Sequence, residues 1–134
     1  MILVDTSVLV DYFKGTSTPA STILATLVET GAELAITAYT YQELLQGARD
    51  EMEFTRLRRV LSTQEILWLP ANLEIHEKAA RLFFDLRRMG VTVHGTIDIL
   101  IALTAIEHQV PLLHSDRDFD RIASHIGHLT IYKT

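Results

Sequence analysis

The sequence has no cysteine among its 134 residues. Disulfide bonds, thiol nucleophiles and cysteine-ligated zinc sites are therefore excluded. The absence also agrees with a reducing compartment. The metalloprotease motif H-E-x-x-H is missing as well, so we expect the six histidines to lie at the surface or to cap helices. His94 and His114 are exceptions, because their loops flank the site inferred below.

Long hydrophobic runs are missing too. The longest, Ile99 to Ile106, is far too short to span a bilayer. The segment from Met1 to Val10 contains Asp5 and lacks the basic start of a signal peptide. We therefore expect a soluble, cytoplasmic protein that makes no contact with a membrane.

Positive charge is scarce. The chain has 12 lysines and arginines against 17 acidic residues, a formal net charge of −5. A passive nucleic-acid binder normally carries a basic surface, so this balance argues against that class. It does not exclude an enzyme whose carboxylates hold cations.

The apolar pattern alternates short buried runs with amphipathic stretches. Such alternation indicates βαβ units, a parallel sheet and right-handed crossovers. We predict one domain over residues 1–134, a three-layer α/β/α sandwich with a central parallel sheet. Strands are expected at 2–5, 34–36, 66–69, near 111–114 and at 129–132. Helices are expected at 6–13, 19–31, 39–48, 50–62, 73–89, 97–108 and 116–125.

Four acidic residues fall where a strand gives way to a helix in this scheme. Asp5 and Asp116 follow strands directly, and Glu43 and Asp98 lie in the first turns of helices. Ligands of open parallel sheets bind beyond the carboxyl ends of the strands. Carboxylates gathered there repel one another unless a cation lies between them. Oxygen ligands suit Mg²⁺, and bound Mg²⁺ can activate water for phosphodiester hydrolysis.

Each acid also has a purely structural interpretation. Asp5 could only cap a helix. The spacing Thr40-x-x-Glu43 matches a capping box, in which the glutamate bonds back to the first amide. Asp98 and Asp116 could complement helix dipoles. An acid that begins a helix as apolar as 97–108, however, needs a partner or a metal.

Four segments resemble the signature regions of PIN-domain ribonucleases, and most closely the VapC toxins of bacterial toxin–antitoxin pairs. They are MILVDTSVLVDYFKG from Met1, YQELLQGA from Tyr41, GTIDILIALTA from Gly95 and VPLLHSDRDFDRIA from Val110. The resemblance extends from Met1 to about Ile122. It implies an endoribonuclease of the PIN fold that requires Mg²⁺ or Mn²⁺ and hydrolyses RNA with metal-activated water.

The resemblance also assigns roles to individual residues. It implies a catalytic acid site of Asp5, Glu43, Asp98 and Asp116. We expect Asp5, Asp98 and Asp116 to bind the metal, with Glu43 at the rim. Three residues are expected to support these acids, namely Thr6, Ser115 and Asp118.

The family pattern further implies a homodimer, an RNA substrate and a cognate VapB-type antitoxin. This chain departs from the pattern at two positions. Many relatives have asparagine before the third acid, where this chain has Ile97, and threonine two residues before the fourth, where it has His114. We expect the antitoxin to bind the segment from Ala38 to Leu61 through exposed apolar residues that include Tyr39, Tyr41 and Phe54.

Three other functions remain as alternatives. A haloacid-dehalogenase-type phosphatase needs a second acid two residues after the first, but Asp5 is followed by Thr6 and Ser7. A response-regulator receiver domain needs an aspartate after the third strand and a late lysine; the Leu67–Pro70 segment has no aspartate. A catalytically inactive PIN-like binding module stays open at this point.

Overall fold

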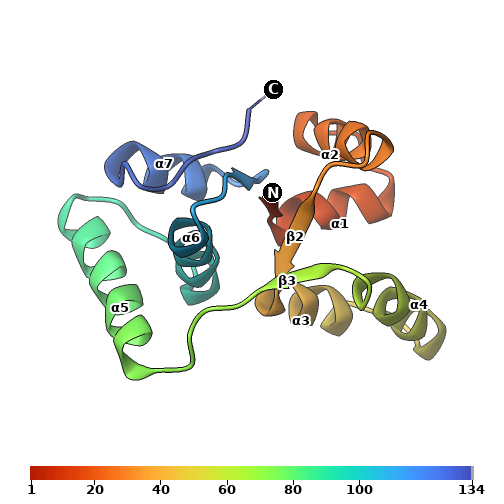
Figure 1. Ribbon diagram of the computed structural model, residues 1–134, viewed down its shortest axis with the longest axis horizontal. Coiled ribbons are helices and arrows are strands. Elements are labelled where there is room, and N and C mark those ends of the chain that lie inside the picture. Colours follow the sequence, from red (N-terminus) through yellow and green to blue (C-terminus); the bar gives the residue numbers. More distant parts are fainter. Residues whose placement is uncertain (134) are drawn as a thin grey trace.

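Four short parallel strands form the centre of the molecule, which is described for residues 1–133 by a computed structural model (Figure 1). The strands lie in the order β3-β2-β1-β4. Their bounds are Ile2–Val4 for β1, Leu34–Thr37 for β2, Glu65–Leu67 for β3 and Leu112–Leu113 for β4. β1 therefore lies inside the sheet, and the acid that follows it emerges near the middle of the carboxyl edge.

Alternate residues of β1 enter different hydrophobic cores. Leu3 packs in a core with residues of α5 (Leu73–Arg88), α6 (Thr96–His108) and α7 (Arg117–His125). Ile2 and Val4 pack in a second core with residues of the first four helices. A strand with apolar residues on both faces is typical of a parallel sheet covered on both sides. The predicted α/β/α sandwich is therefore confirmed, and Figure 1 shows the two helical layers on either side of the strands.

The second layer consists of α1 (Thr6–Lys14), α2 (Pro19–Glu29), α3 (Ala38–Gln46) and α4 (Glu51–Leu61). Polar side chains cap their N-termini, as Thr18 does for α2 and Asp50 for α4. Gly15 ends α1 at a φ of 73°, a left-handed conformation that glycine adopts without strain. Within residues 1–133, no helix is long and apolar enough to cross a membrane.

The C-terminal segment differs from the expectation. Residues 129–132 do not form a strand; Ile131 makes only an isolated parallel bridge with Leu112. The backbone bonds there are Leu112 N to Thr130 O at 2.9 Å and Tyr132 N to Leu112 O at 2.8 Å. On this side of β4, only Leu112 is paired, whereas both residues of β4 pair with β1. β3 also differs from the strand expected at 66–69, since it runs from Glu65 to Leu67.

Candidate functional site

Asp5 joins β1 to α1 and is almost fully buried, with 4% of its surface exposed. Its Oδ2 accepts hydrogen bonds from the backbone N–H of Ser7 at 3.0 Å and from the Ser7 hydroxyl at 2.6 Å. Burial raises the pKa of Asp5, hydrogen bonds from Ser7 and Thr6 oppose this shift, and the charge of Glu43 adds to it. Asp5 therefore caps a helix and also has a raised pKa.

Glu43 lies in α3, which begins earlier than the capping-box interpretation requires. Thr37 caps the helix and accepts from the backbone of Thr40, so Thr40 lies inside the helix. The capping-box alternative for Glu43 is therefore wrong. Glu43 Oε1 instead accepts a hydrogen bond of 2.8 Å from the Thr6 hydroxyl. Thr6 thus ties Glu43 to the first turn of α1, next to Asp5.

Asp98 lies in the first turn of α6, whose N-terminus at Gly95 has no side-chain cap. Burial and then the charges of four neighbouring carboxylates raise the pKa of Asp98 to about 6. These neighbours, in order of effect, are Asp5, Asp116, Asp118 and Glu43. The acids predicted from distant parts of the sequence therefore lie close enough to Asp98 for their charges to raise its pKa.

Asp116 and Asp118 come from the start of α7. Asp116 caps this helix, since its Oδ1 accepts from the Asp118 backbone N–H at 2.9 Å. The buried carboxylate of Asp118 lies 3.1 Å from His94 Nδ1 and 3.2 Å from a guanidinium nitrogen of Arg121. Desolvation alone would raise the pKa of Asp118, but the hydrogen bonds and charges of His94 and Arg121 outweigh it and lower the pKa. Asp118 is therefore ionised more readily than Asp98.

Three carboxylates have the spacing of a metal site. One oxygen each of Asp98, Asp116 and Asp118 lies within 4.8 Å of the others. Asp118, expected only as a supporting acid, is thus part of the tightest group, and among residues 1–133 Asp5 does not meet this spacing. The donor set consists of carboxylate oxygens alone, which fits Mg²⁺ or Mn²⁺ better than zinc or copper. A bound cation would also offset the repulsion that raises the pKa of Asp98.

Ser7 is the supporting residue that the sequence reasoning missed. Its hydroxyl donates to Asp5 and accepts from the backbone N–H of Ser115 at 3.0 Å. Ser115 itself is exposed and contributes this backbone group. The D-T-S order held a usable signal, because the second residue after a capping aspartate donates its N–H to that side chain.

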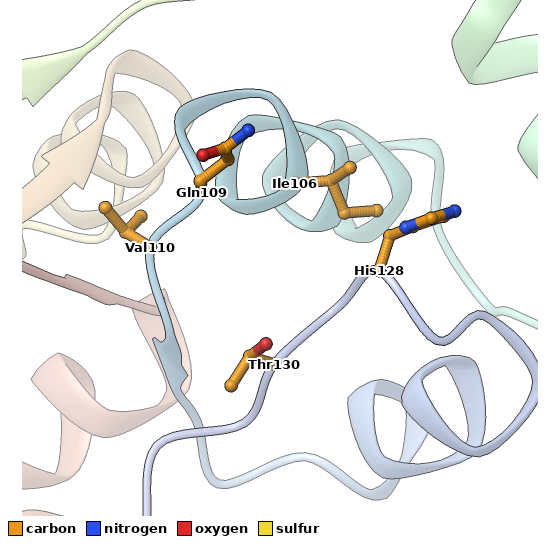
Figure 2. A pocket seen from close by; sticks show the side chains of 5 residues that line it. All are labelled: Ile106, Gln109, Val110, His128 and Thr130. Carbon is orange, nitrogen blue, oxygen red and sulfur yellow. The ribbon is translucent and has the colours of Figure 1, made fainter.

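Two hollows of the surface differ in their relation to these acids. A pocket of about 430 Å³ lies where α6 ends and residues 128–130 pass by, and Figure 2 shows the side chains that line it. None of these lining residues is acidic. A larger groove of about 920 Å³ runs between α1, α3 and α4 and includes Glu43. Of the site acids, only Glu43 lines this groove, and none lines the pocket at the far end of α6.

Comparisons with known proteins agree with this architecture. The PIN domain family model matches residues 2–124. Ribonuclease VapC11 of Mycobacterium tuberculosis is 36% identical over 124 residues, which are 92% of this chain and 92% of the relative. Ribonuclease VapC51 of the same organism is 35% identical over 126 residues, which cover 93% of this chain and 87% of the relative.

Solved structures share the fold at lower identity. VapBC-1 from nontypeable Haemophilus influenzae aligns with a TM-score of 0.74 at 21% identity, covering 99% of this chain and 98% of that one. VapBC2 from Rickettsia felis, bound to a promoter DNA fragment, aligns with a TM-score of 0.72 at 21% identity and covers 98% of both chains. The predicted resemblance is confirmed: this chain belongs to the PIN-domain family, and its curated relatives place it among the VapC-type members.

Proposed function

We propose that this chain is a metal-dependent endoribonuclease, with residues 1–134 acting as a single domain. Asp98, Asp116 and Asp118 hold Mg²⁺ or Mn²⁺, Asp5 completes the site from β1, and Glu43 lies at its rim. When bound, such an ion supplies an activated water and stabilises the leaving oxygen of a phosphodiester. The carboxylates of the chain supply the oxygen ligands and the negative charge that attract the ion.

One observation supports this proposal above the others. The pKa of Asp98 is raised to about 6 by burial and by four other acids, although Asp98 heads an uncapped helix that favours negative charge. A structural helix acid needs no such neighbours. Perturbed acids converging at the carboxyl edge of a parallel sheet are typical of a functional site.

RNA cleavage tests the proposal directly. With Mg²⁺ or Mn²⁺, the wild type should cleave total cellular RNA and leave 3′-hydroxyl and 5′-phosphate ends. Asp98→Asn should reduce the rate by roughly a hundredfold or more, the scale expected for a group that acts on transition-state charge. Glu77→Gln, an exposed acid on α5, serves as the matched control and should retain full activity. Products with 2′,3′-cyclic phosphates, or equal activity in EDTA, would contradict the mechanism.

Several relatives with the same fold are toxin–antitoxin complexes, and we extend that partnership to this chain. The proposed role is the toxin of a type II pair, neutralised by a VapB-type antitoxin. The groove between α1, α3 and α4 supports it, since it combines the apolar Phe13, Leu44 and Leu57 with Arg56 and reaches Glu43. Its apolar residues suit one face of an amphipathic helix, and Glu43 with the neighbouring acids suits a basic tail.

The aromatic residues expected to contact the antitoxin are only partly available. Phe54 is 40% exposed, whereas Tyr39 and Tyr41 are partly buried against the two cores. The expected exposure of both tyrosines was therefore wrong. Leu57→Glu should leave the chain toxic even when a small antitoxin gene next to its own is co-expressed. Full rescue of this variant would place the antitoxin on another surface.

The homodimer belongs to the same proposal. A groove of about 390 Å³ between α5 and α6 is lined by apolar residues that include Phe83, Phe84 and Leu100. Phe84 is 39% exposed and lies beside the partly buried Phe83, so the two rings form an apolar patch on α5. This face is the proposed contact between two copies. Light scattering after gel filtration should give twice the chain mass for the wild type and the chain mass for Phe84→Glu.

A further inference from the structure

His114 occupies the turn between β4 and α7 with its imidazole almost fully buried, the side chain being 6% exposed. The ring packs against Phe119 at a centroid distance of 5.3 Å. Both ring nitrogens have polar neighbours. Nδ1 accepts from the Asp116 backbone N–H at 3.0 Å, and Nε2 lies 3.1 Å from Oδ1 of Asp120.

These contacts define the tautomer of the ring. A backbone N–H can only donate, so Nδ1 must present its lone pair to Asp116. The ring proton then lies on Nε2 and points at the carboxylate of Asp120, which can only accept when ionised. Asp120 therefore selects the tautomer in which His114 is an acceptor for the main chain of Asp116. In a neutral histidine, the hydrogen bond made by one ring nitrogen commonly determines whether the other nitrogen carries the proton.

Asp116 is consequently held at two points. His114 binds its backbone N–H, and the Asp118 N–H binds its Oδ1. Within residues 1–133, Oδ2 of Asp116 accepts no hydrogen bond. The backbone bond fixes the peptide before α7, and the side-chain bond fixes the plane of the carboxylate that faces Asp98 and Asp118.

We propose that His114, oriented by Asp120, is a positioning residue that sets the direction of the Asp116 carboxylate in the acid cluster. The proposal rests on the proposed function, because it takes Asp116 as a metal-binding residue. Its alternative is that His114 only fills space beside Phe119. The space-filling role requires only an aromatic ring beside Phe119, whereas the positioning role requires an acceptor at the place of Nδ1.

Paired variants separate the two roles. His114→Phe keeps an aromatic ring against Phe119 and removes both nitrogens. His114→Asn loses the ring but places an oxygen near the position of Nδ1. Affinity for Mn²⁺ alone, measured by electron paramagnetic resonance of the free ion, should fall by roughly tenfold or more in His114→Phe, as for groups that orient metal ligands. It should stay within about threefold of the wild type in His114→Asn, and His128→Phe, at an exposed position outside the proposed site and dimer contact, should leave it unchanged.

The opposite order of affinities, with His114→Phe like the wild type, would overturn the proposal. A second measurement needs no variant at this position. Long-range ¹H–¹⁵N spectra of the wild type with Mg²⁺ should show His114 protonated at Nε2 alone, and Asp120→Ala should broaden or shift this pattern. A proton on Nδ1 of the wild type would refute the assignment.

A further control distinguishes this inference from the proposed function. Asp116→Asn should weaken Mn²⁺ binding more than any His114 variant does. If Asp116→Asn binds Mn²⁺ like the wild type, the metal site itself is misassigned. If Asp116→Asn loses Mn²⁺ while His114→Phe keeps it, the metal site stands and only the positioning role fails.

Discussion

Replacing Asp98 by asparagine should make the metal-free protein more stable at neutral pH. The substitution keeps the size of the side chain and removes one charge from a group of mutually repelling carboxylates. In the folded protein, burial and four acidic neighbours raise the pKa of Asp98 from 3.8 to about 6. The ionised form therefore costs the folded state free energy that the unfolded chain does not pay.

The size of the effect follows from this shift. A change of about two pKa units corresponds to about 3 kcal/mol if no solvent reaches the group. Asp98 is only partly buried, and screening by water reduces the repulsion to about half of this value. The substitution also removes the favourable interaction of the charge with the α6 dipole, which lowers the stability of the variant by about 0.5 kcal/mol. The net gain is about 1 kcal/mol, which raises the melting temperature of a domain of this size by about 3–4 °C.

The pH dependence of the free energy of unfolding provides a second test of this prediction. The folded protein keeps its proton on Asp98 to a higher pH than the unfolded chain does, so wild-type stability falls as pH rises from 3.8 towards about 6. The difference between Asp98→Asn and wild type should therefore be small at about pH 4 and complete above about pH 7. Calorimetry in EDTA measures both, with Glu77→Gln as the control for removing an exposed charge. A variant that is less stable at pH 7.5 and still cleaves RNA would refute the assignment of Asp98 to the site.

Two further predictions concern the same acids. Millimolar Mg²⁺ or Mn²⁺ should raise the wild-type melting temperature by preferential binding to the folded state, and the rise should be smaller in Asp5→Asn; equal shifts would remove Asp5 from the site. Ser7→Ala should destabilise the metal-free protein by about 1–2 kcal/mol in urea unfolding, because it leaves the buried Asp5 without one donor. The exposed Ser124→Ala provides the comparison, and a Ser7→Ala protein as stable as that control would contradict the role of the hydroxyl.

The sheet and the position of Asp5 could be predicted because local signals agree there. An apolar run followed by an acid indicates a buried strand that ends in a helix cap, and the structure has both. The start of α3 could not be read in the same way. Thr37 and Thr40 are both suitable caps, and the pairing of Thr37 with Leu67 in the sheet decides between them.

Which acids form the cluster could not be predicted from the sequence, because this depends on contacts between residues far apart in the chain. Asp116, Asp118 and Asp120 alternate along one short segment, and the sequence alone does not show which of them faces Asp98. The first turn of α7 brings Asp118 inward, where His94 and Arg121 hold it, and leaves Asp120 exposed beside His114. The apolar residues at 129–132 likewise do not show how many of them pair with β4, and the structure has a single bridge there.

The hydrogen bond between Ser7 and Ser115 joins residues separated by 108 positions, and β1 pairs with β4 just beside it. During synthesis, Asp5 leaves the ribosome early and β2 soon follows, but β4 and the acids of α7 are missing until residues 112–118 have been made. Domains generally fold only once their distant segments can meet. The acid cluster of a growing chain is therefore incomplete until α7 has been made, so the proposed metal site forms late in synthesis.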